Sequence, residues 1–600
     1  MAAGKGYSDG EQHYLPVMPE QEQVVTTVPF TQHGAGTEQL DLTQLFPTGS
    51  KDKKLTVEYT NNPTWLMIQA LPALSAPTTD DVISQAAAYY SNSMAGHLLK
   101  SAPQIQSTLE LWKQEKGTET SLMSQLEKDQ DLKTLVLDET PWVMDARKET
   151  DQKQQLLQYF DASALDYRLG SSLGKIKKLQ NPDGSWSWWP GMPGSLYMTT
   201  AVSEILVRLN AMVGKQGNTS ALLAAAFRYM GKKIAEEVAE MKKAEKKGMK
   251  NLRPSETAVH YLYLCALDGR KLPASQQSDA AYLTQHLAKQ TAAFTIYGKA
   301  LAAVIFGKSS HDTALAKQYL QSLMEYSVYR KETGRYFDTP KAYYSWFDYR
   351  IPTQVAAIEA LKLLRPQDHQ AIEEMQRWLL QEKRTTSWST PINSVDAVYA
   401  FLEGETGKLS SQGESTVLKV DGKVLETPKA TAGLGYVKTT VDGDHVKAFT
   451  AEKTSAGTSW GAVYAQFMQK TAEVAKASAG MSIDREIIGG TDQLKVGDKV
   501  RVRITITADR DYDFVQVADK RAACLEPVHQ LSGYQGGYYC SPRDNATYYY
   551  FDRLSKGKHV IETEYYVDRS GTYSMGTCTV QSAYCPSYGG RSAVQSLIIK

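Results

Sequence analysis

The run Asn181-Pro182-Asp183-Gly184-Ser185-Trp186-Ser187-Trp188-Trp189-Pro190-Gly191 is the most unusual stretch of the sequence. Its Pro and Gly residues predict a turn, and its three tryptophans give that turn a large apolar surface. We consider two roles for Trp186, Trp188 and Trp189. They could stack on sugar rings, or they could plug the end of a helical domain. The second role is the simpler one, because large aromatic side chains are mostly buried on average.

The segments on both sides of this run have the apolar spacing of helices. From about residue 80 to 405, apolar side chains recur with a helical period between short polar or Gly/Pro breaks. About a dozen consecutive helices predict helical hairpins, either wound into a closed α/α toroid or stacked as a solenoid. The clearest helical segments are 81–100, 196–212, 220–245, 257–267, 291–306, 352–364 and 369–381.

Strands are predicted before and after the helical region. Apolar and polar side chains alternate between about 12 and 68, and again after 405, as in 415–420. A final block begins near Met481, where 500–507 alternates strictly, as in an antiparallel sheet with one buried face. The predicted fold class is therefore multidomain α+β, in the order β, large α insert, β, and a separate β-sandwich.

Composition excludes several classes of function. The 600 residues contain 67 Lys and Arg against 66 Asp and Glu, so no global charge favours binding to nucleic acid. No stretch reaches the roughly 20 apolar residues of a membrane span. The first ten residues lack the pattern of a secretory signal, so we expect either a cytosolic protein or a fragment of a longer one.

Cysteine placement favours an oxidising compartment. Cys265 lies in a helical segment, whereas Cys524, Cys540, Cys578 and Cys585 fall within the last 80 residues. These four predict two disulfides, for which three pairings are open, with buried free thiols as the alternative. A metal site is disfavoured because the spacings contain no C-x-x-C knuckle.

Each candidate motif for catalysis or metal binding lacks the context or spacing that its chemistry requires. The stretch 457–461 matches the G-x-S-x-G pattern, but strand-like segments flank it, so we interpret it as a hairpin turn. The ten histidines do not pair at the spacing of two ligands on one helix face. We therefore predict no catalytic residue, cofactor or metal. The Lys/Glu-rich run 232–250 is most simply a solvated helix face, with a partner site as the alternative.

The tryptophan run resembles the internal loop of the thioester domain of alpha-2-macroglobulin and complement proteins. Further similarities follow in order along the chain: 387–390 with 396–402 is similar to the closing segment of that domain, and 481–485 to the start of the last domain. Residues 496–498, with Asp519 and the Leu-Glu-Pro at 525–527, resemble the bacterial pattern. The chain is thus similar to the C-terminal region of bacterial alpha-2-macroglobulin-like proteins.

The resemblance implies a specific domain order. It places the first part of a CUB-like β-domain at 1–68 and a thioester-type α/α toroid at 69–405. The second part of the CUB-like domain follows at 406–478, and a macroglobulin-type, receptor-binding-like antiparallel β-sandwich at 479–600.

The toroid of this family begins with a Cys-x-Glu-Gln motif whose Cys and Gln form an internal thioester. The corresponding stretch here, 70–81, contains neither Cys nor Gln. The degenerate position comprises Ser75, Ala76, Pro77, Thr78 and Thr79. The resemblance therefore implies the scaffold of the family without covalent capture, because the acyl group needs the Cys.

The expected function is that of a non-covalent protease-trapping inhibitor, not an enzyme, in a C-terminal fragment of a larger exported protein. The expected partners are proteases and upstream macroglobulin domains of the same protein, with envelope proteins as further candidates and no nucleic acid. The expected location is the periplasm or the bacterial cell surface, with anchoring through a segment before residue 1.

Two alternatives stay open. One is a cell-surface adhesion or scaffolding protein. The other is a polysaccharide-active or glycan-binding toroid, which predicts a groove in which carboxylates or a Tyr/His pair face the Trp186 loop.

Overall fold

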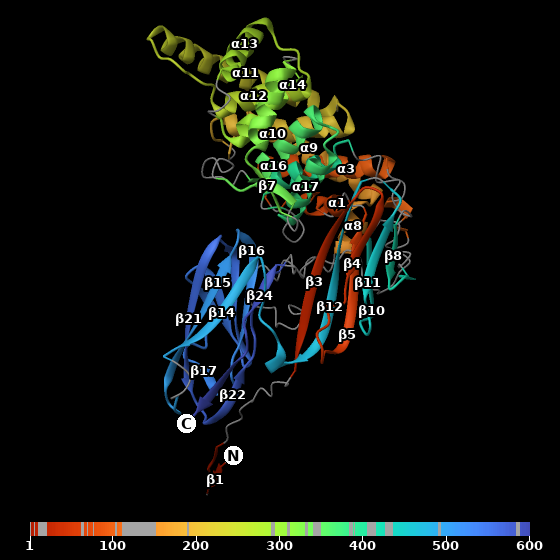
Figure 1. Cartoon of the computed structure of the whole chain (residues 1–600). Helices are drawn as coiled ribbons and strands as arrows, with labels where there is room; N and C mark the ends of the chain where they lie inside the picture. Colours follow the sequence, from red (N-terminus) through yellow and green to blue (C-terminus); the bar gives the residue numbers. More distant parts are fainter. Residues whose placement is uncertain are drawn as a thin grey trace.

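The computed structural model of the chain consists of a helical body and two β-units (Figure 1). The structure describes the following residues: 2–4, 7–9, 21–61, 65–68, 70–75, 77, 79–101, 105–107, 109–110, 152–188, 191–215, 217–289, 294–308, 312–330, 334–339, 350–382, 388, 390–404, 416–426, 436–455, 457–489, 494–583 and 588–600.

The first β-unit is assembled from strands that lie on both sides of the helical body in the sequence. One sheet has the order β10-β5-β12-β3, and the other has the order β4-β11-β8-β9. Strand β5 thus lies between two strands from more than 370 residues later, with Val57 opposite both Thr439 and Val463. The strands are β3 (Gln21–His33), β4 (Gly36–Asp41), β5 (Lys51–Thr60), β8 (Thr416–Val420), β9 (Lys423–Val424), β10 (Tyr436–Asp442), β11 (Ala448–Lys453) and β12 (Thr458–Lys470).

Apolar side chains from both sheets share one core in this unit. Phe30, Leu55 and Val57 from one sheet pack with Phe449 and Ala451 from the other. Alternation along each strand directs these side chains inward, which is the pattern expected for two packed antiparallel sheets. The helical body is therefore an insertion between strands of a single β-unit.

Six helices of the described helical body contact one another in a closed ring. The contacts run from α3 to α10, α12, α14, α16 and α18, and α18 returns to α3. The ring helices are α3 (Val82–Ser101), α10 (Leu196–Val213), α12 (Glu256–Asp268), α14 (Ile296–Lys308), α16 (Arg350–Leu364) and α18 (Pro391–Leu402).

A second set of helices packs against the outside of this ring. Helix α9 packs on α3, α11 on α10, α13 on α11, α15 on α14, and α17 on α16. These outer helices are α9 (Ala162–Leu179), α11 (Gly217–Lys246), α13 (Ala274–Ala288), α15 (Thr313–Met324) and α17 (His369–Gln381). Short helices α1 (Trp65–Ile68), α2 (Leu71–Ser75) and α8 (Gln152–Tyr159) lie near α18 and α3.

Burial differs between the two sets in the way their sequences require. Helix α14 is buried at every residue from 296 to 306, so it can be apolar all round. Outer helices such as α9 bury one face and expose the other. Together the apolar faces form one continuous core through the helical body.

One hairpin inside the helical region was not predicted from the helical period. It consists of β6 (Ser327–Arg330) and β7 (Gly334–Phe337). Aromatic and β-branched residues favour strands here, and Gly334 adopts a φ of 84° where a Cβ would lie 2.2 Å from the Glu374 carbonyl.

The C-terminal β-unit contains an eleven-stranded antiparallel sheet with the order β17-β21-β15-β14-β13-β24-β23-β16-β20-β19-β18, and a two-stranded sheet, β22-β25. Residues from both ends of the long sheet, such as Ile504 and Val517, belong to one core, so the sheet folds over itself as a sandwich. The strands are β13 (Ala477–Ala479), β14 (Met481–Ile488), β15 (Lys499–Ala508), β16 (Tyr512–Lys520), β17 (Leu525–Pro527), β18 (Gly533–Gln535), β19 (Tyr538–Pro542), β20 (Ala546–Leu554), β21 (Gly557–Val567), β22 (Gly571–Met575), β23 (Cys578–Ser582), β24 (Gly589–Arg591) and β25 (Gln595–Ile599).

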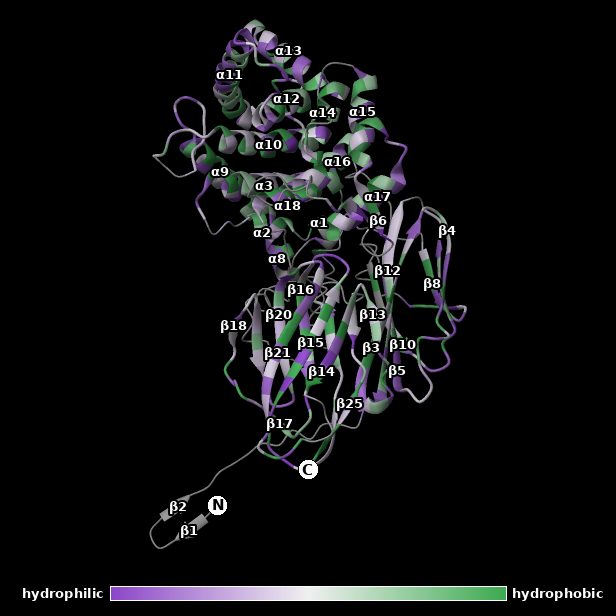
Figure 2. Cartoon of the chain, turned by 60° about the vertical axis from the view of Figure 1, so that its left-hand side comes forward, coloured by the Kyte–Doolittle hydropathy of each residue, from purple (hydrophilic) through white to green (hydrophobic). Residues whose placement is uncertain are grey.

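The two β-units lie beside each other, and the helical body lies at one end of both (Figures 1 and 2). A separate hairpin, β1 (Ala2–Gly4) and β2 (Tyr7–Asp9), precedes them. None of the helices among the described residues has the length and apolar character to cross a membrane.

Candidate functional site

The segment predicted to be the degenerate thioester position, residues 75–79, joins α2 to α3. Ser75 ends α2, and its hydroxyl donates to the Pro72 carbonyl at 2.7 Å. Thr79 is exposed and donates to the Asp81 carboxylate at 2.5 Å. Asp81 in turn accepts from the backbone N–H of Ser84 at 2.9 Å, so it caps α3. Pro77 is half-buried, and Ala76 and Thr78 lie outside the described residues. The polar groups of this segment therefore stabilise the start of a helix.

Thioester chemistry requires a reactive thiol, and the sequence has no cysteine before Cys265. Cys265 lies in α12, which contacts α10 and α14 in the ring. Burial raises the pKa of the Cys265 thiol to about 12, so the thiol stays protonated at neutral pH. This cysteine is thus a buried apolar side chain and not a nucleophile.

The three tryptophans of the loop before α10 have different surroundings. Trp186 is fully buried, and its indole N–H donates to the Ile176 carbonyl at 3.2 Å. Trp188 is 40% exposed and stacks on Tyr197 with ring centroids 5.4 Å apart. Trp189 lies outside the described residues. Trp186 therefore fills the core of the helical body, and one face of Trp188 is already covered.

Local hydrogen bonds determine the shape of this loop. The Asp183 carboxylate accepts from the backbone N–H and the hydroxyl of Ser185, at 3.0 and 2.6 Å. Gly184 has a φ of 90°, and a Cβ there would lie 2.3 Å from the Ala225 carbonyl of α11. The loop is thus held against α11 at a position that only glycine fits.

A buried ionic cluster lies between the ring helices. Arg208 of α10 forms ion pairs with Asp396 of α18 and with Glu204, the latter at 2.8 Å. Tyr263 of α12 accepts from Arg208 at 3.3 Å and donates to Glu359 of α16 at 2.5 Å. We call these five residues, together with His260 and Tyr399, the ring-centre cluster. His260 pairs with Glu204 at 2.8 Å, and Tyr399 donates to Glu359 at 3.3 Å.

The carboxyls of the ring-centre cluster have unequal acidity. Burial raises the pKa of Asp396 to about 7 and also raises the pKa of Glu359. Burial acts in the same direction at Glu204, but the charges of Arg208 and His260 outweigh it and lower its pKa to about 2. Through its ion pairs and hydrogen bonds, the cluster ties four ring helices together.

Sequence reasoning missed the ring-centre cluster. Its signal was a charged residue inside an otherwise apolar helix, such as Arg208 in 205–209 or Asp396 in 395–398. A buried charge is normally paired, but the sequence does not reveal the partner. Within the described residues, no group of three or more His, Cys, Asp or Glu side chains could hold a metal ion.

The G-x-S-x-G stretch lies at the start of a strand. Residues from Thr458 onward belong to β12 and pair with β3 and β5, and Ser459 is fully buried. No helix follows the serine, so this stretch lacks the strand-turn-helix geometry of a nucleophile elbow.

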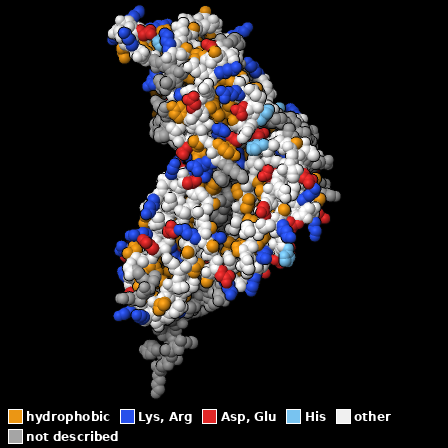
Figure 3. All heavy atoms as spheres, in the orientation of Figure 1, with side chains coloured by type: hydrophobic (Ala, Val, Ile, Leu, Met, Phe, Trp, Pro, Cys, Tyr) orange, Lys and Arg blue, Asp and Glu red, His pale blue; other side chains and the backbone are white. Residues whose placement is uncertain are grey.

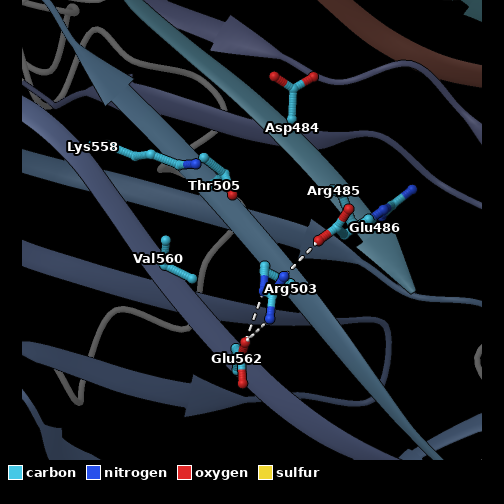
Figure 4. A pocket seen from close by; sticks show the side chains of 8 residues that line it. All are labelled: Asp484, Arg485, Glu486, Arg503, Thr505, Lys558, Val560 and Glu562. Carbon is cyan, nitrogen blue, oxygen red and sulfur yellow. Dashed lines mark hydrogen bonds and ion pairs between the residues drawn. The ribbon is translucent and has the colours of Figure 1, made fainter. Parts of the chain in front are cut away.

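An open hollow of about 560 Å³ lies over β14, β15 and β21 of the C-terminal β-unit (Figure 4). Arg503 at its centre bonds to Glu562 at 2.7 Å and to Glu486 at 3.0 Å. The lining residues are Asp484, Arg485, Glu486, Arg503, Thr505, Lys558, Val560 and Glu562. Charges of both signs pair across neighbouring strands here, as on the solvated face of a sheet.

The opposite face of β14 carries a buried ion pair. Arg485 donates to Asp519 of β16 at 2.7 Å, and both side chains are at most 1% exposed. Arg485 also donates to the carbonyls of Lys520 at 3.0 Å and Gly576 at 2.6 Å. Two sequence motifs that are 34 residues apart thus meet inside the sandwich.

Part of the C-terminal β-unit matches a known domain family. Residues 469–587 match the sequence model of the bacterial Alpha-2-macroglobulin MG10 domain. This part of the chain is therefore similar to the MG10 domain of bacterial alpha-2-macroglobulins. A search of curated protein sequences gave no match.

Solved structures of alpha-2-macroglobulins are similar to the chain at low identity. Native Escherichia coli alpha-2-macroglobulin, from domain MG7 to the C-terminus, is 13% identical over 97% of this chain and 83% of that chain, with a TM-score of 0.36. Trypsin-activated Escherichia coli alpha-2-macroglobulin is 13% identical over 96% of this chain and 36% of that chain, with a TM-score of 0.47. The Salmonella protein reacted with methylamine is 14% identical over 96% and 34%, with a TM-score of 0.36. The chain thus spans about a third of the length of these last two.

Three of the four predicted disulfide cysteines are buried free thiols, namely Cys524, Cys540 and Cys578. Cys585 lies outside the described residues. Cys578 in β23 and Cys540 in β19 are three strands apart, about 14 Å at the usual strand spacing. A disulfide needs Cα atoms within about 7 Å, so the sheet is incompatible with a Cys540–Cys578 bond. Each of the three pairings would join two of these three cysteines, and none of the three is bonded, so no predicted disulfide is found among the described residues.

Polar contacts join the three units of the chain. Glu22 of β3 accepts from the Thr577 hydroxyl of the C-terminal β-unit at 2.5 Å. Arg330 of β6 pairs with Asp509 at 3.0 Å. Glu373 of α17 bonds to His33 and Thr458 of the first β-unit. Each unit therefore contacts the other two through hydrogen bonds and ion pairs.

Proposed function

We propose that the chain is the C-terminal part of a protease-trapping inhibitor of the bacterial alpha-2-macroglobulin type, which holds proteases without a covalent bond. The observation that carries this proposal is the MG10 match at 469–587. In the proposed domain order, the helical ring is the thioester-type toroid, the first β-unit is the CUB-like domain, and the C-terminal β-unit is the receptor-binding-like sandwich.

Two observations support trapping without a thioester. The segment at the degenerate position has no thiol, and Asp81, Thr79 and Ser84 form a helix cap there. The thiol of Cys265 is buried and has a raised pKa. Capture would then depend on enclosing the protease, and the helical ring would act as a packing and contact domain.

Enclosure requires the units to move relative to one another. Some of the contacts between them are exposed, as at Arg330 and Asp509, where each side chain is about one-third exposed. Exposed ion pairs are typically worth about 0–1 kcal/mol, so a rearrangement could exchange them at small cost. Cleavage of a bait segment upstream of this chain would trigger that rearrangement.

The proposed partners are proteases and the upstream macroglobulin domains of the same protein, with envelope proteins as further candidates. The proposed location is the periplasm or the bacterial cell surface, with anchoring through a segment that precedes residue 1. No catalytic role is proposed.

Limited proteolysis of the full-length parent protein tests the proposal. After cleavage by each of several proteases, small-angle scattering reports the shape, and residual activity is measured on large and small substrates. We expect compaction after one cut, loss of activity on large substrates only, and no protease adduct that survives boiling in detergent. If cleavage causes no shape change and no inhibition, the trapping proposal is wrong. A stable adduct would contradict the non-covalent mode.

The glycan-active alternative is not favoured by the described geometry. It requires tryptophan and carboxylate side chains that face a groove. Trp186 and the three carboxylates of the ring-centre cluster are buried, and Tyr197 covers one face of the exposed Trp188. An adhesion or scaffolding protein would show no response to proteases in the same experiment.

A further inference from the structure

The C-terminal end of α11 carries a concentrated positive charge. Helices α11 and α13 lie at the end of the helical body furthest from both β-units (Figures 1 and 2). Between Glu240 and Arg253 there are six basic side chains and two acidic ones, a net charge of +4. The whole chain has a net charge of only +1, so this excess is local. Figure 3 shows Lys and Arg side chains gathered at this projecting end.

The two carboxylates in this stretch already have partners. Glu240 pairs with Lys243 at 3.4 Å, and Glu245 pairs with His286 of α13 at 3.2 Å. Lys246, Lys247 and Lys250 are exposed, and no ion pair involves them within the described part of the chain. Their charge is therefore not balanced locally.

An apolar side chain stands among these lysines. Gly248 has a φ of 84° and donates to the Glu245 carbonyl at 2.8 Å, and Met249 donates to the Ala244 carbonyl at 3.1 Å. These two bonds form a Schellman motif, in which the residue after the glycine usually packs back on the helix. Met249 is instead 58% exposed. The turn thus holds an apolar side chain in solvent, and we call Lys246, Lys247, Met249 and Lys250 the basic tip.

We propose that the basic tip docks on a membrane surface that contains anionic phospholipid headgroups. Lysines attract the negative surface, and the Met249 side chain enters the apolar boundary between headgroups and acyl chains. The tip projects from the molecule, so it fits a broad surface that adapts around it. An acidic protein partner would need a matching concave site, which makes it the less favoured occupant.

Flotation of the intact 600-residue chain with vesicles tests this proposal. The vesicles contain either phosphatidylcholine alone or a mixture with phosphatidylglycerol. We expect binding to the anionic vesicles only, and weaker binding at high salt, because salt screens exposed charges. Each lysine near an anionic surface contributes about fivefold in affinity, so the triple variant K246Q/K247Q/K250Q should bind about 100-fold more weakly.

A matched variant controls for total charge. Lys51, Lys54 and Lys423 are exposed on the first β-unit, so K51Q/K54Q/K423Q removes the same charge elsewhere. This control should bind like the unchanged chain, and Met249→Ser should weaken binding several-fold at unchanged salt dependence. The proposal is overturned if phosphatidylglycerol makes no difference, if the two triple variants lose affinity equally, or if the chain binds poly-glutamate but not the vesicles.

Discussion

Breaking the buried pair between Arg485 and Asp519 should severely destabilise the C-terminal β-unit. Asp519→Ala removes the carboxylate and leaves the Arg485 guanidinium buried. Among the described residues, its remaining hydrogen-bond acceptors are the carbonyls of Lys520 and Gly576. The removal of one partner of a fully buried ion pair costs about 3–5 kcal/mol. For a domain of this size, such a loss corresponds to a decrease in melting temperature of about 10–20 °C.

Native-state hydrogen exchange measures this cost locally. A chain with several units does not unfold in one two-state step, so the global transition alone is a poor readout. Amide exchange in β14 and β16 instead reports the free energy of opening of this unit. We expect exchange there to accelerate by about 100-fold or more in Asp519→Ala, with little change in the helical body.

Two further variants separate the ion pair from general effects of mutation. Arg485→Met with Asp519→Leu removes both charges, so it should recover most of the lost stability. Arg503→Met breaks the ion pair between Arg503 and Glu562, whose side chains are 39% and 34% exposed, respectively. This variant should lower the free energy of unfolding by about 1 kcal/mol or less. If Asp519→Ala costs less than about 1 kcal/mol, or if the double variant is as unstable as the single one, the structural role assigned to this pair is wrong.

Four other predictions concern the helical body and its junction with the first β-unit. Gly184→Ala should destabilise the helical body by more than about 2 kcal/mol in thermal denaturation, because a Cβ at this positive φ meets backbone. Trp186→Ala should cost about 3–5 kcal/mol and Trp188→Ala less than about 1 kcal/mol in the same assay, since only the first is fully buried. Burial lowers the pKa of Lys453 from 10.5 to about 8. The free-energy cost of burying its charge is therefore complete below about pH 8 and decreases as the pH rises towards 10.5. Lys453→Met should stabilise the chain by about 1–2 kcal/mol at pH 7 and by less at pH 10, as measured by denaturant titration. The Cys265 thiol should resist a thiol reagent at pH 8 in the folded chain and react on denaturation, as followed by absorbance.

The outcome for the Trp186 loop shows what a local pattern can predict. Pro182, Asp183 and Gly184 indicate a turn, and the structure contains a turn in which Asp183 accepts from the backbone N–H of Ser185. The pattern did not determine which tryptophan is buried, because that depends on α9 and α10 closing around Trp186. Trp186 and Trp188 have the same side chain and lie two positions apart, but the first is fully buried and the second is 40% exposed.

The sequence by itself determined the mixed α and β composition, the positions of several helices and strands, and the resemblance to alpha-2-macroglobulins. These depend on periodicity, turn residues and short motifs, all of which act over a few residues. It also determined that no cysteine precedes Cys265, because this is a matter of residue identity alone.

Only the tertiary structure decided which distant residues meet. It paired β5 with β10 and β12, closed six helices into a ring, and joined Arg208 to Asp396 and Arg485 to Asp519. The sequence contains each of these charges but not its partner, since a buried charge is stabilised by whichever opposite charge the packing brings within a few ångströms. Partner choice is a property of the packed chain, because local preferences extend over a few residues while these pairs span 34 to 188.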